Sequence, residues 1–350
     1  MAIYQFLIAV RQAGGEGQLT NENGEVTSHL IGMLHRTINM MEAGLKPVFV
    51  FDGKPPTMKS GQLAKRKERQ QAAEAELTKL QESGGSAEEI ERQQKRIVRA
   101  TREQSEEVKK LLILMGVPVV DAPCEAEATC AALNKAGLVY ATGTEDMDAL
   151  TFGTPIMLRH LNSPQSRKLP IVEIKLDRTL HDFGISMEQF IDVCILCGCD
   201  YVESIKGIGH ITALKLIREH DNLEGVLAHL EKKKTPLPEP FPFDEARRLF
   251  QEPEVVDTST IELKWIEPDV PGLLKYLVEE KQFAEERVQS AIKRLQACKG
   301  KNSQNRLESF FGPATIVPSA AKEAKRKAAE QAAKTKGIKG KMAANKKAKR

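Results

Sequence analysis

Apolar residues follow two different spacings along the chain. Residues 46–53 (KPVFVFDG) and 138–146 (LVYATGTED) are short runs rich in β-branched and aromatic side chains, with an aspartate at or near the end. Such runs are typical of buried parallel strands. Helical spacing predicts helices over residues 3–12, over 124–137, on both sides of the Gly-Ile-Gly turn in 203–220, and repeatedly between about residues 221 and 299.

The segment 59–110 interrupts this pattern. It holds thirteen basic and ten acidic residues, no aromatic residue, and an SGGS break at residues 83–86. It predicts two charged helices joined by a flexible turn. Because it offers little to bury, we expect an arch or lid over the sheet. The whole pattern favours an α/β fold with a mostly parallel central sheet and helices on both faces.

Six carboxylates stand at strand ends or helix starts: Asp52, Glu125, Glu127, Asp146, Asp148 and Asp200. Each alone has an ordinary explanation, either as a turn former or as a charge that complements a helix dipole. In a doubly wound fold, however, the carboxyl ends of the strands open on one crevice. Oxygen ligands without histidine or thiolate suit Mg²⁺ or Mn²⁺. Two such ions can clamp an in-line displacement at phosphorus, so the pattern predicts phosphodiester hydrolysis.

Two further features could bind phosphate. Lys59 and Arg66 share one face of the first charged helix and could hold a scissile phosphate above the metals; a solvated helix face is the alternative. Gly207 and Gly209 permit a tight turn whose amides, at the start of a helix, can bind phosphate, although any helical hairpin would also use them.

Charge and cysteine content narrow the class of protein. Residues 318–350 carry twelve Lys or Arg against two Glu, so the net charge of +4 comes from a basic tail and residues 1–317 carry −6. We expect a disordered tail that acts as a solubiliser, a nuclear-import signal or a nucleic-acid tether.

The run CILCGC lacks the second pair of ligands that zinc needs, which favours buried, reduced thiols. No apolar run is long enough for a membrane span.

The run QNRLESFF stands in a polar linker at residues 304–311. Gln304, Leu307, Phe310 and Phe311 would present one aliphatic and two aromatic plugs to a partner's pocket. A final core helix is the alternative.

These segments resemble the eukaryotic flap endonucleases, structure-specific 5′ nucleases of replication and repair with a PIN-like fold. The resemblance rests on VFVFDGKPP, KSGQLAKR, DAPCEAEA, TEDMDALTFG, CGCDYVESIKGIG and QNRLESFF, in that order. It implies that the six carboxylates hold two Mg²⁺ ions, with Mn²⁺ as a substitute, and that Lys59 and Arg66 belong to a catalytic gateway beneath the arch. It also implies DNA contacts at Tyr4, Arg11, Arg36, Glu125, Gly198, Asp200, Gly207 and Gly209.

The resemblance further implies the activities and partners of the family. These are cleavage of branched DNA with 5′ flaps, 5′ to 3′ exonuclease and gap endonuclease activity, removal of RNA primers in Okazaki fragment maturation, and long-patch base excision repair. Residues 304–311 resemble the motif that docks on the trimeric sliding clamp, proliferating cell nuclear antigen (PCNA). A monomeric nuclease of the nucleus (nucleolus and nucleoplasm), with the mitochondrion as a second location and no membrane association, is expected.

The same resemblance predicts a division of the chain. We expect a truncated N-terminal nuclease region (1–71), an arch connection (72–88), an internal nuclease region with a helix-two-turn-helix element (89–220), a helical region (221–302), the clamp motif (304–311) and a basic tail (312–350).

Two departures from the family pattern qualify these expectations. His210 and Ile211 replace the proline and lysine that usually follow the second glycine of the turn. The family's opening segment, with its N-terminal glycine region and a central strand bearing another metal-binding aspartate, has no counterpart in the printed sequence. We therefore expect either a truncated gene model of an active nuclease or a catalytically impaired short form that binds branched DNA and the clamp. A Holliday-junction or excision-repair nuclease is disfavoured by the short arch and the clamp motif.

Overall fold

The computed structural model describes residues 3–4, 7, 26–161 and 169–298. The first elements are α2 (Ser28–Glu42), β1 (Phe49–Phe51), the 3-10 turn η1 (Thr57–Lys59), α3 (Ser60–Glu82), α4 (Ala87–Ile97) and α5 (Arg102–Leu114). The middle of the chain forms β2 (Val119–Asp121), α6 (Ala126–Lys135), β3 (Thr142–Gly143), α7 (Asp148–Thr151), β4 (Ile156–Arg159) and β5 (Val172–Lys175). The remaining elements are α8 (Leu176–Phe183), α9 (Met187–Cys197), α10 (His210–His220), α11 (Leu223–Lys232), α12 (Phe243–Gln251), α13 (Val270–Leu274), the π-helix η3 (Lys275–Glu280) and α14 (Glu285–Ala297).

Five short strands make two small sheets within the described ranges. In one, β1 and β2 are parallel; in the other, β3 and β4 are parallel and β5 runs antiparallel to β4. The α/β class is as expected, but the sheet is divided and the strand predicted over 138–146 is only two residues long. The side-chain amide of Asn134 donates to the carbonyl oxygens of Val139 and Tyr140 at 3.0 and 2.9 Å. These carbonyls therefore bond to a side chain instead of a strand.

The apolar side chains gather in two clusters. The larger cluster joins α6, α7 and β4 to helices α8 to α12, with Ile195, Leu196 and Ile217 fully buried. The second cluster joins α2, β1 and α5 to α13, η3 and α14, around residues such as Leu30 and Leu111. All described residues belong to one compact unit of the chain, and the carboxylates discussed below are carried by elements of both clusters.

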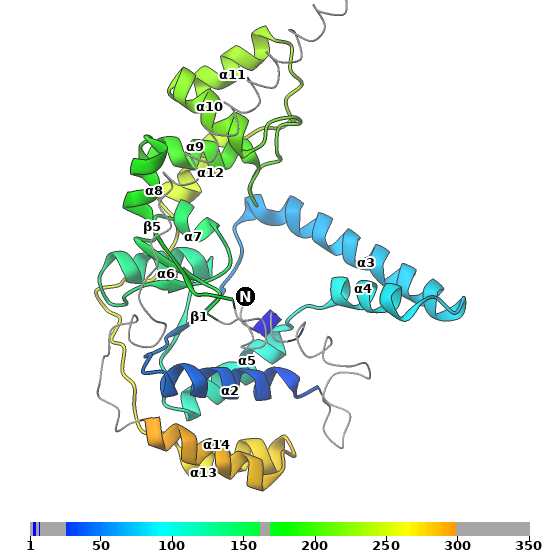
Figure 1. The fold of residues 1–350 in the computed structure, drawn as a ribbon, viewed down its shortest axis with the longest axis vertical. Coiled ribbons are helices and arrows are strands. Elements are labelled where there is room, and N and C mark those ends of the chain that lie inside the picture. Colours follow the sequence, from blue (N-terminus) through cyan, green and yellow to red (C-terminus); the bar gives the residue numbers. More distant parts are fainter. Residues whose placement is uncertain (1–2, 5–6, 8–25, 162–168, 299–350) are drawn as a thin grey trace, which may run out of the picture. The chain divides into compact units, whose positions relative to one another are not determined.

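The charged segment forms the expected pair of helices, which projects from the rest of the fold (Figure 1). Only Ala73 is buried in α3 and no residue is buried in α4. Two helices were predicted over residues 59–110, and this was wrong for the end of the segment, which belongs to a third helix, α5. The Thr101 side chain caps that helix, and Val108 and Leu111 are buried on one face. These two residues lie one helical turn apart, at and just past the end of the charged segment, where the apolar face begins.

The helix predicted just before the Gly-Ile-Gly turn is also wrong. Helix α9 ends at Cys197, residues 198–209 form a loop, and α10 begins at His210. Gly198 ends α9 with φ of +88°, and Gly207 adopts φ of +86°. Both values are in the region that favours glycine, so the backbone turns before the segment that was predicted to be helical and again at the predicted Gly-Ile-Gly turn. Helices α9 and α10 pack against each other.

The single tryptophan lies beside the start of β1. The indole nitrogen of Trp265 donates to the carbonyl oxygen of Pro47 at 2.9 Å, and the Lys46 ammonium lies 5.5 Å from the ring centroid. This contact joins residue 265 to the segment just before β1, a strand of the second apolar cluster that lies more than two hundred residues earlier in the chain.

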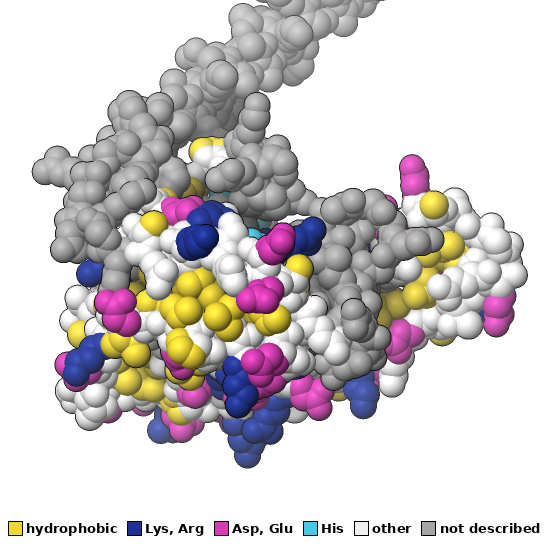
Figure 2. Space-filling model, turned by 90° about the horizontal axis from the view of Figure 1, so that it is seen from below, with side chains coloured by type: hydrophobic (Ala, Val, Ile, Leu, Met, Phe, Trp, Pro, Cys, Tyr) yellow, Lys and Arg dark blue, Asp and Glu magenta, His cyan; other side chains and the backbone are white. Residues whose placement is uncertain are grey.

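The surface carries charges of both signs. Figure 2 shows acidic and basic side chains interspersed around an apolar patch on the face seen from below. Within the described ranges, no helix is both long and apolar enough to cross a membrane.

Candidate active site

Asp52 is held at the carboxyl end of β1 against the start of α6. Its Oδ1 accepts a hydrogen bond from the backbone N–H of Ala126 at 3.0 Å. The N–H of the following residue, Gly53, donates to the carbonyl oxygen of Cys124 at 2.7 Å. A Cβ at Gly53 would lie 2.2 Å from the carbonyl oxygen of Ala122, so only glycine allows this approach. The Asp-Gly pair therefore fixes where the first carboxylate stands.

Glu125 and Glu127 lie at the start of α6, the first as its N-cap and the second in its first turn. Their surroundings differ. Glu125 faces a lysine, described below, whereas Glu127 is largely removed from water. Burial raises the pKa of Glu127, and the negative charges of Asp52 and Asp146 raise it further. Asp52 and Asp146 are therefore both close enough to Glu127 for their charges to repel its carboxylate.

Asp146 lies in the short connection after β3, and Asp148 begins the next helix, α7. The N–H of Asp146 donates to Oγ1 of Thr144, and the N–H of Asp148 donates to Oδ1 of Asp146, both at 3.1 Å. Burial raises the pKa of Asp148 to about 7, with smaller contributions from the charges of Asp146 and Asp200. The Asp148 carboxyl is thus poorly compensated by its protein surroundings.

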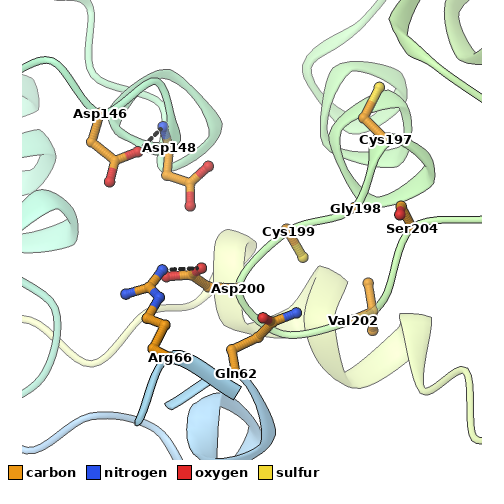
Figure 3. A pocket seen from close by; sticks show the side chains of 10 residues that line it. All are labelled: Gln62, Arg66, Asp146, Asp148, Cys197, Gly198, Cys199, Asp200, Val202 and Ser204. Carbon is orange, nitrogen blue, oxygen red and sulfur yellow. Dashed lines mark hydrogen bonds and ion pairs between the residues drawn. The ribbon is translucent and has the colours of Figure 1, made fainter. Parts of the chain in front are cut away.

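A cavity of about 440 Å³ opens beside these residues. Asp146 and Asp148 lie on one side of it, with Asp200 and Arg66 opposite them (Figure 3). Gly198 lines the cavity where α9 ends, and a Cβ there would lie 2.7 Å from Cβ of Ser204. The complete lining is Gln62, Arg66, Asp146, Asp148, Cys197, Gly198, Cys199, Asp200, Val202 and Ser204.

Two cations at the base of the arch contact the carboxylates directly. The Lys59 ammonium lies 2.9 and 2.8 Å from the two oxygens of Glu125 and 3.1 Å from Oδ2 of Asp200. Nη2 of Arg66 lies 2.6 Å from Oδ1 of Asp200. Lys59 is at the junction of η1 and α3, and Arg66 is seven residues later on α3, so the predicted face does turn toward the site.

The six predicted carboxylates are therefore brought together in two linked groups. The charges of Asp52 and Asp146 act on the Glu127 carboxyl, and those of Asp146, Asp200 and Glu125 act on the Asp148 carboxyl. Their role as metal ligands stays a prediction. Across residues 3–4, 7, 26–161 and 169–298, no three His, Cys, Asp or Glu side chains are gathered closely enough to hold a metal ion. The oxygens of Glu125 and Asp200 are instead turned toward Lys59 and Arg66.

The chemistry of these donors nevertheless fits a hard divalent cation. The donors are carboxylate oxygens, and the raised pKa values of Glu127 and Asp148 indicate negative charge that the protein does not fully neutralise. The nearby thiols are poor competitors, since burial raises the pKa of Cys197 and raises that of Cys199 to about 11. Mg²⁺ or Mn²⁺ suits this donor set better than zinc.

The remaining predicted positions are those for DNA contact and for clamp binding. Tyr4 is 39% exposed, and burial lowers the pKa of the Arg36 guanidinium in α2. Gly207 lies in the loop before α10 and Gly209 caps that helix; a Cβ at either would meet open space. Arg11 lies outside the described residues, as do Gln304, Leu307, Phe310 and Phe311.

Sequence reasoning missed three residues around this site. Gln62 lines the cavity one helical turn before Arg66, so the shared face of α3 was the available signal. Lys65 forms an ion pair with Glu203, which lies 138 residues later in the chain. No local pattern in the sequence signals that pair.

Comparison with known proteins decides the family. Two family models match: the XPG N-terminal domain over residues 1–73 and the XPG I-region over residues 116–200. Flap endonuclease 1 of Xenopus tropicalis is 58% identical over 311 residues, which cover 89% of this chain and 81% of that protein. The chain belongs to the flap endonuclease family.

Two solved structures support the family assignment. Flap endonuclease-1 from Methanococcus jannaschii is 33% identical, with a TM-score of 0.65, and the match covers 86% of this chain and 91% of that one. The catalytic core of Rad2, solved in complex with DNA substrate, is 25% identical, with a TM-score of 0.63 over 84% of this chain and 90% of that one. The expected 5′-nuclease fold and the resemblance to flap endonucleases are thereby confirmed.

Proposed function

We propose that this chain is a structure-specific nuclease that cuts branched DNA at the base of a 5′ flap by metal-assisted hydrolysis of a phosphodiester. The observation that carries the proposal is the convergence of acidic side chains beneath two cations of the arch. These acidic residues come from the end of β1, the start of α6, the segment from β3 into α7, and the loop after α9. Membership of the flap endonuclease family supports the substrate, and the DNA-bound Rad2 core supports binding of DNA by this fold.

The residues of the site have two different proposed roles, metal binding and phosphate binding. Asp52, Glu125, Glu127, Asp146, Asp148 and Asp200 would hold two Mg²⁺ ions. When bound, the ions supply a hydroxide from water and stabilise the leaving oxygen. Lys59 and Arg66 offer ammonium and guanidinium donors that can turn from Glu125 and Asp200 toward a phosphate and hold it for attack.

The arch gives a physical reason for a flap as substrate. Helices α3 and α4 together bury one side chain in the described structure, so they contribute little to the hydrophobic core. Their base nevertheless delivers Lys59 and Arg66 to the carboxylates. A single strand that reaches the site must pass these cations, whereas the loop with Gly207 and Gly209 at the start of α10 can contact the duplex beside it.

We extend the proposal to the finer activities expected of the family. These are 5′ to 3′ exonuclease and gap endonuclease cleavage in Okazaki fragment maturation and long-patch base excision repair. Binding of PCNA through Gln304, Leu307, Phe310 and Phe311, and residence in the nucleus with the mitochondrion as a second location, are proposed on the same basis. The aromatic pair in a polar linker supports the clamp contact.

Cleavage of a duplex carrying a labelled 5′ flap, with Mg²⁺ present, tests the function. Wild-type chain is expected to release the flap, and Asp148→Ala is expected to bind the substrate but not cut it. Asp182→Asn on α8, a change to a partly exposed carboxylate outside the site, serves as the control and should cut normally. Loss of both binding and cutting in Asp148→Ala would indicate a folding role. Binding without cutting in the wild type would favour the branched-DNA and clamp-binding module.

The clamp contact has its own test. Phe310→Ala combined with Phe311→Ala is expected to weaken association with PCNA in surface plasmon resonance, while flap cleavage without the clamp stays unchanged. Equal affinity for PCNA in the double variant would remove these residues from the proposal.

A further inference from the structure

The base of α3 is attached to the fold by charged side chains. Within α3 the only buried residue is Ala73, about two turns beyond Arg66, and the helix packs mainly against α4. Met58, just before α3, is partly buried against the larger apolar cluster. With so little apolar anchoring, ion pairs at the base have a large share in deciding where α3 lies.

Three charged residues of this base contact the loop between α9 and α10. Lys59 and Arg66 both pair with Asp200, and Lys65 pairs with Glu203. Asp200 is a proposed metal ligand, so its contacts with the cations compete with metal binding. Glu203 has no such second role in the site. The Lys65–Glu203 pair can therefore persist when Asp200 has turned toward a metal ion.

Glu203 stands on a firmly anchored part of the loop. Its neighbours Tyr201, Val202 and Ile205 are buried in the larger cluster, at 7%, 4% and 1% exposure. The N–H of Cys199 donates to the carbonyl oxygen of Val202 at 3.3 Å, closing the turn. The Glu203 side chain thus projects from a fixed backbone to meet a lysine on a weakly anchored helix.

We propose that Lys65 and Glu203 are positioning residues for flap cleavage: their ion pair holds the base of α3 in the position that places Lys59 and Arg66 at the reacting phosphate. This inference rests on the proposed function. Neither residue lines the cavity, and both side chains are partly exposed, at 44% and 59%. The pair acts through the neighbouring cation Arg66 rather than on the substrate.

Single-turnover cleavage of the 5′ flap tests the pair through a charge exchange. Lys65→Glu and Glu203→Lys alone are each expected to slow the rate at saturating DNA about two- to fivefold, the size of effect that one exposed ion pair produces. The double variant, which restores opposite charges, is expected to recover most of the wild-type rate. Lys67→Met, an exposed lysine on the same helix, is the control for loss of positive charge near DNA and should leave this rate unchanged.

Substrate affinity separates positioning from direct DNA contact. Positioning predicts that Glu203→Gln slows the saturated rate with little change in the Kd for the flap substrate. Weaker DNA binding in Lys65→Glu with no recovery in the double variant would assign Lys65 to a phosphate contact and overturn the proposal. Normal rates in both single variants would also overturn it.

Hydrogen exchange of the DNA-free chain gives a readout that does not depend on cleavage. Amides of residues 60–66 are expected to exchange faster in Glu203→Gln than in wild type, while amides of α10 keep their protection. Unchanged exchange in residues 60–66 would contradict the inference. If the wild type itself fails to cut, the proposed function is wrong, and this measurement still decides whether the ion pair holds α3.

Discussion

Replacing Asp148 with asparagine should stabilise the metal-free fold at alkaline pH. The pKa of this carboxyl is raised from 3.8 to about 7, chiefly by burial. The folded state therefore binds more protons than the unfolded state between these values, and the free energy of unfolding falls as pH rises through this window. Above pH 7 the full penalty applies, at most about 4 kcal/mol for a shift of this size.

Urea unfolding of Asp148→Asn and wild type, both with a chelator, measures this penalty. The variant is expected to gain up to about 4 kcal/mol at pH 8 and about 1.5 kcal/mol at pH 5, because most of the penalty is relieved when the folded carboxyl is protonated. Saturating Mg²⁺ should shrink the gain at pH 8, since it stabilises only the chain that keeps the carboxylate. Asp182→Asn controls for loss of a charge. A loss of stability, or an equal gain at both pH values, would refute the electrostatic account.

Three further predictions follow from individual contacts. Lys59→Met is expected to tighten Mg²⁺ binding by the DNA-free chain about five- to thirtyfold in calorimetric titration, because the ammonium no longer holds the oxygens of Glu125; weaker binding would contradict this. Arg247→Met should cost about 3 kcal/mol in urea unfolding, since it strips Asp192, 3% exposed, of its bidentate partner, and adding Asp192→Asn should recover part of that loss. Gly198→Ala should cost roughly 2 to 4 kcal/mol, as its φ of +88° and a close neighbour both exclude a methyl group; a neutral change in thermal unfolding would show that the loop relaxes.

Much of the candidate site could be predicted because its signals are local. An apolar run that ends in Asp-Gly predicts a buried strand with a carboxylate at its end, and Asp52 follows β1 in that way. Lys59 and Arg66 are seven residues apart, close to two helical turns, so their common direction follows from helix geometry. The topology of an α/β fold then brings such residues to one edge without any knowledge of side-chain contacts.

The remainder depends on contacts that the sequence does not encode locally. The backbone of residues 138–141 looked like a strand, but the Asn134 amide bonds to two of its carbonyls. Residues 203–206 looked helical, but the turn at Gly198 and the burial of Ile205 keep them in a loop. Charge composition alone also concealed α5, because its apolar face begins only at Val108.

The two apolar clusters have a consequence for how unfolding is measured. The only indole of the chain lies beside β1, on the side of the smaller cluster, and far-ultraviolet dichroism is dominated by helices of both clusters. Tryptophan emission therefore reports on one half of the hydrophobic interior, and dichroism on the whole. If the halves melt together, the two signals will give one midpoint; if they separate, comparing the fluorescence midpoint with the two steps in dichroism identifies which half was lost first.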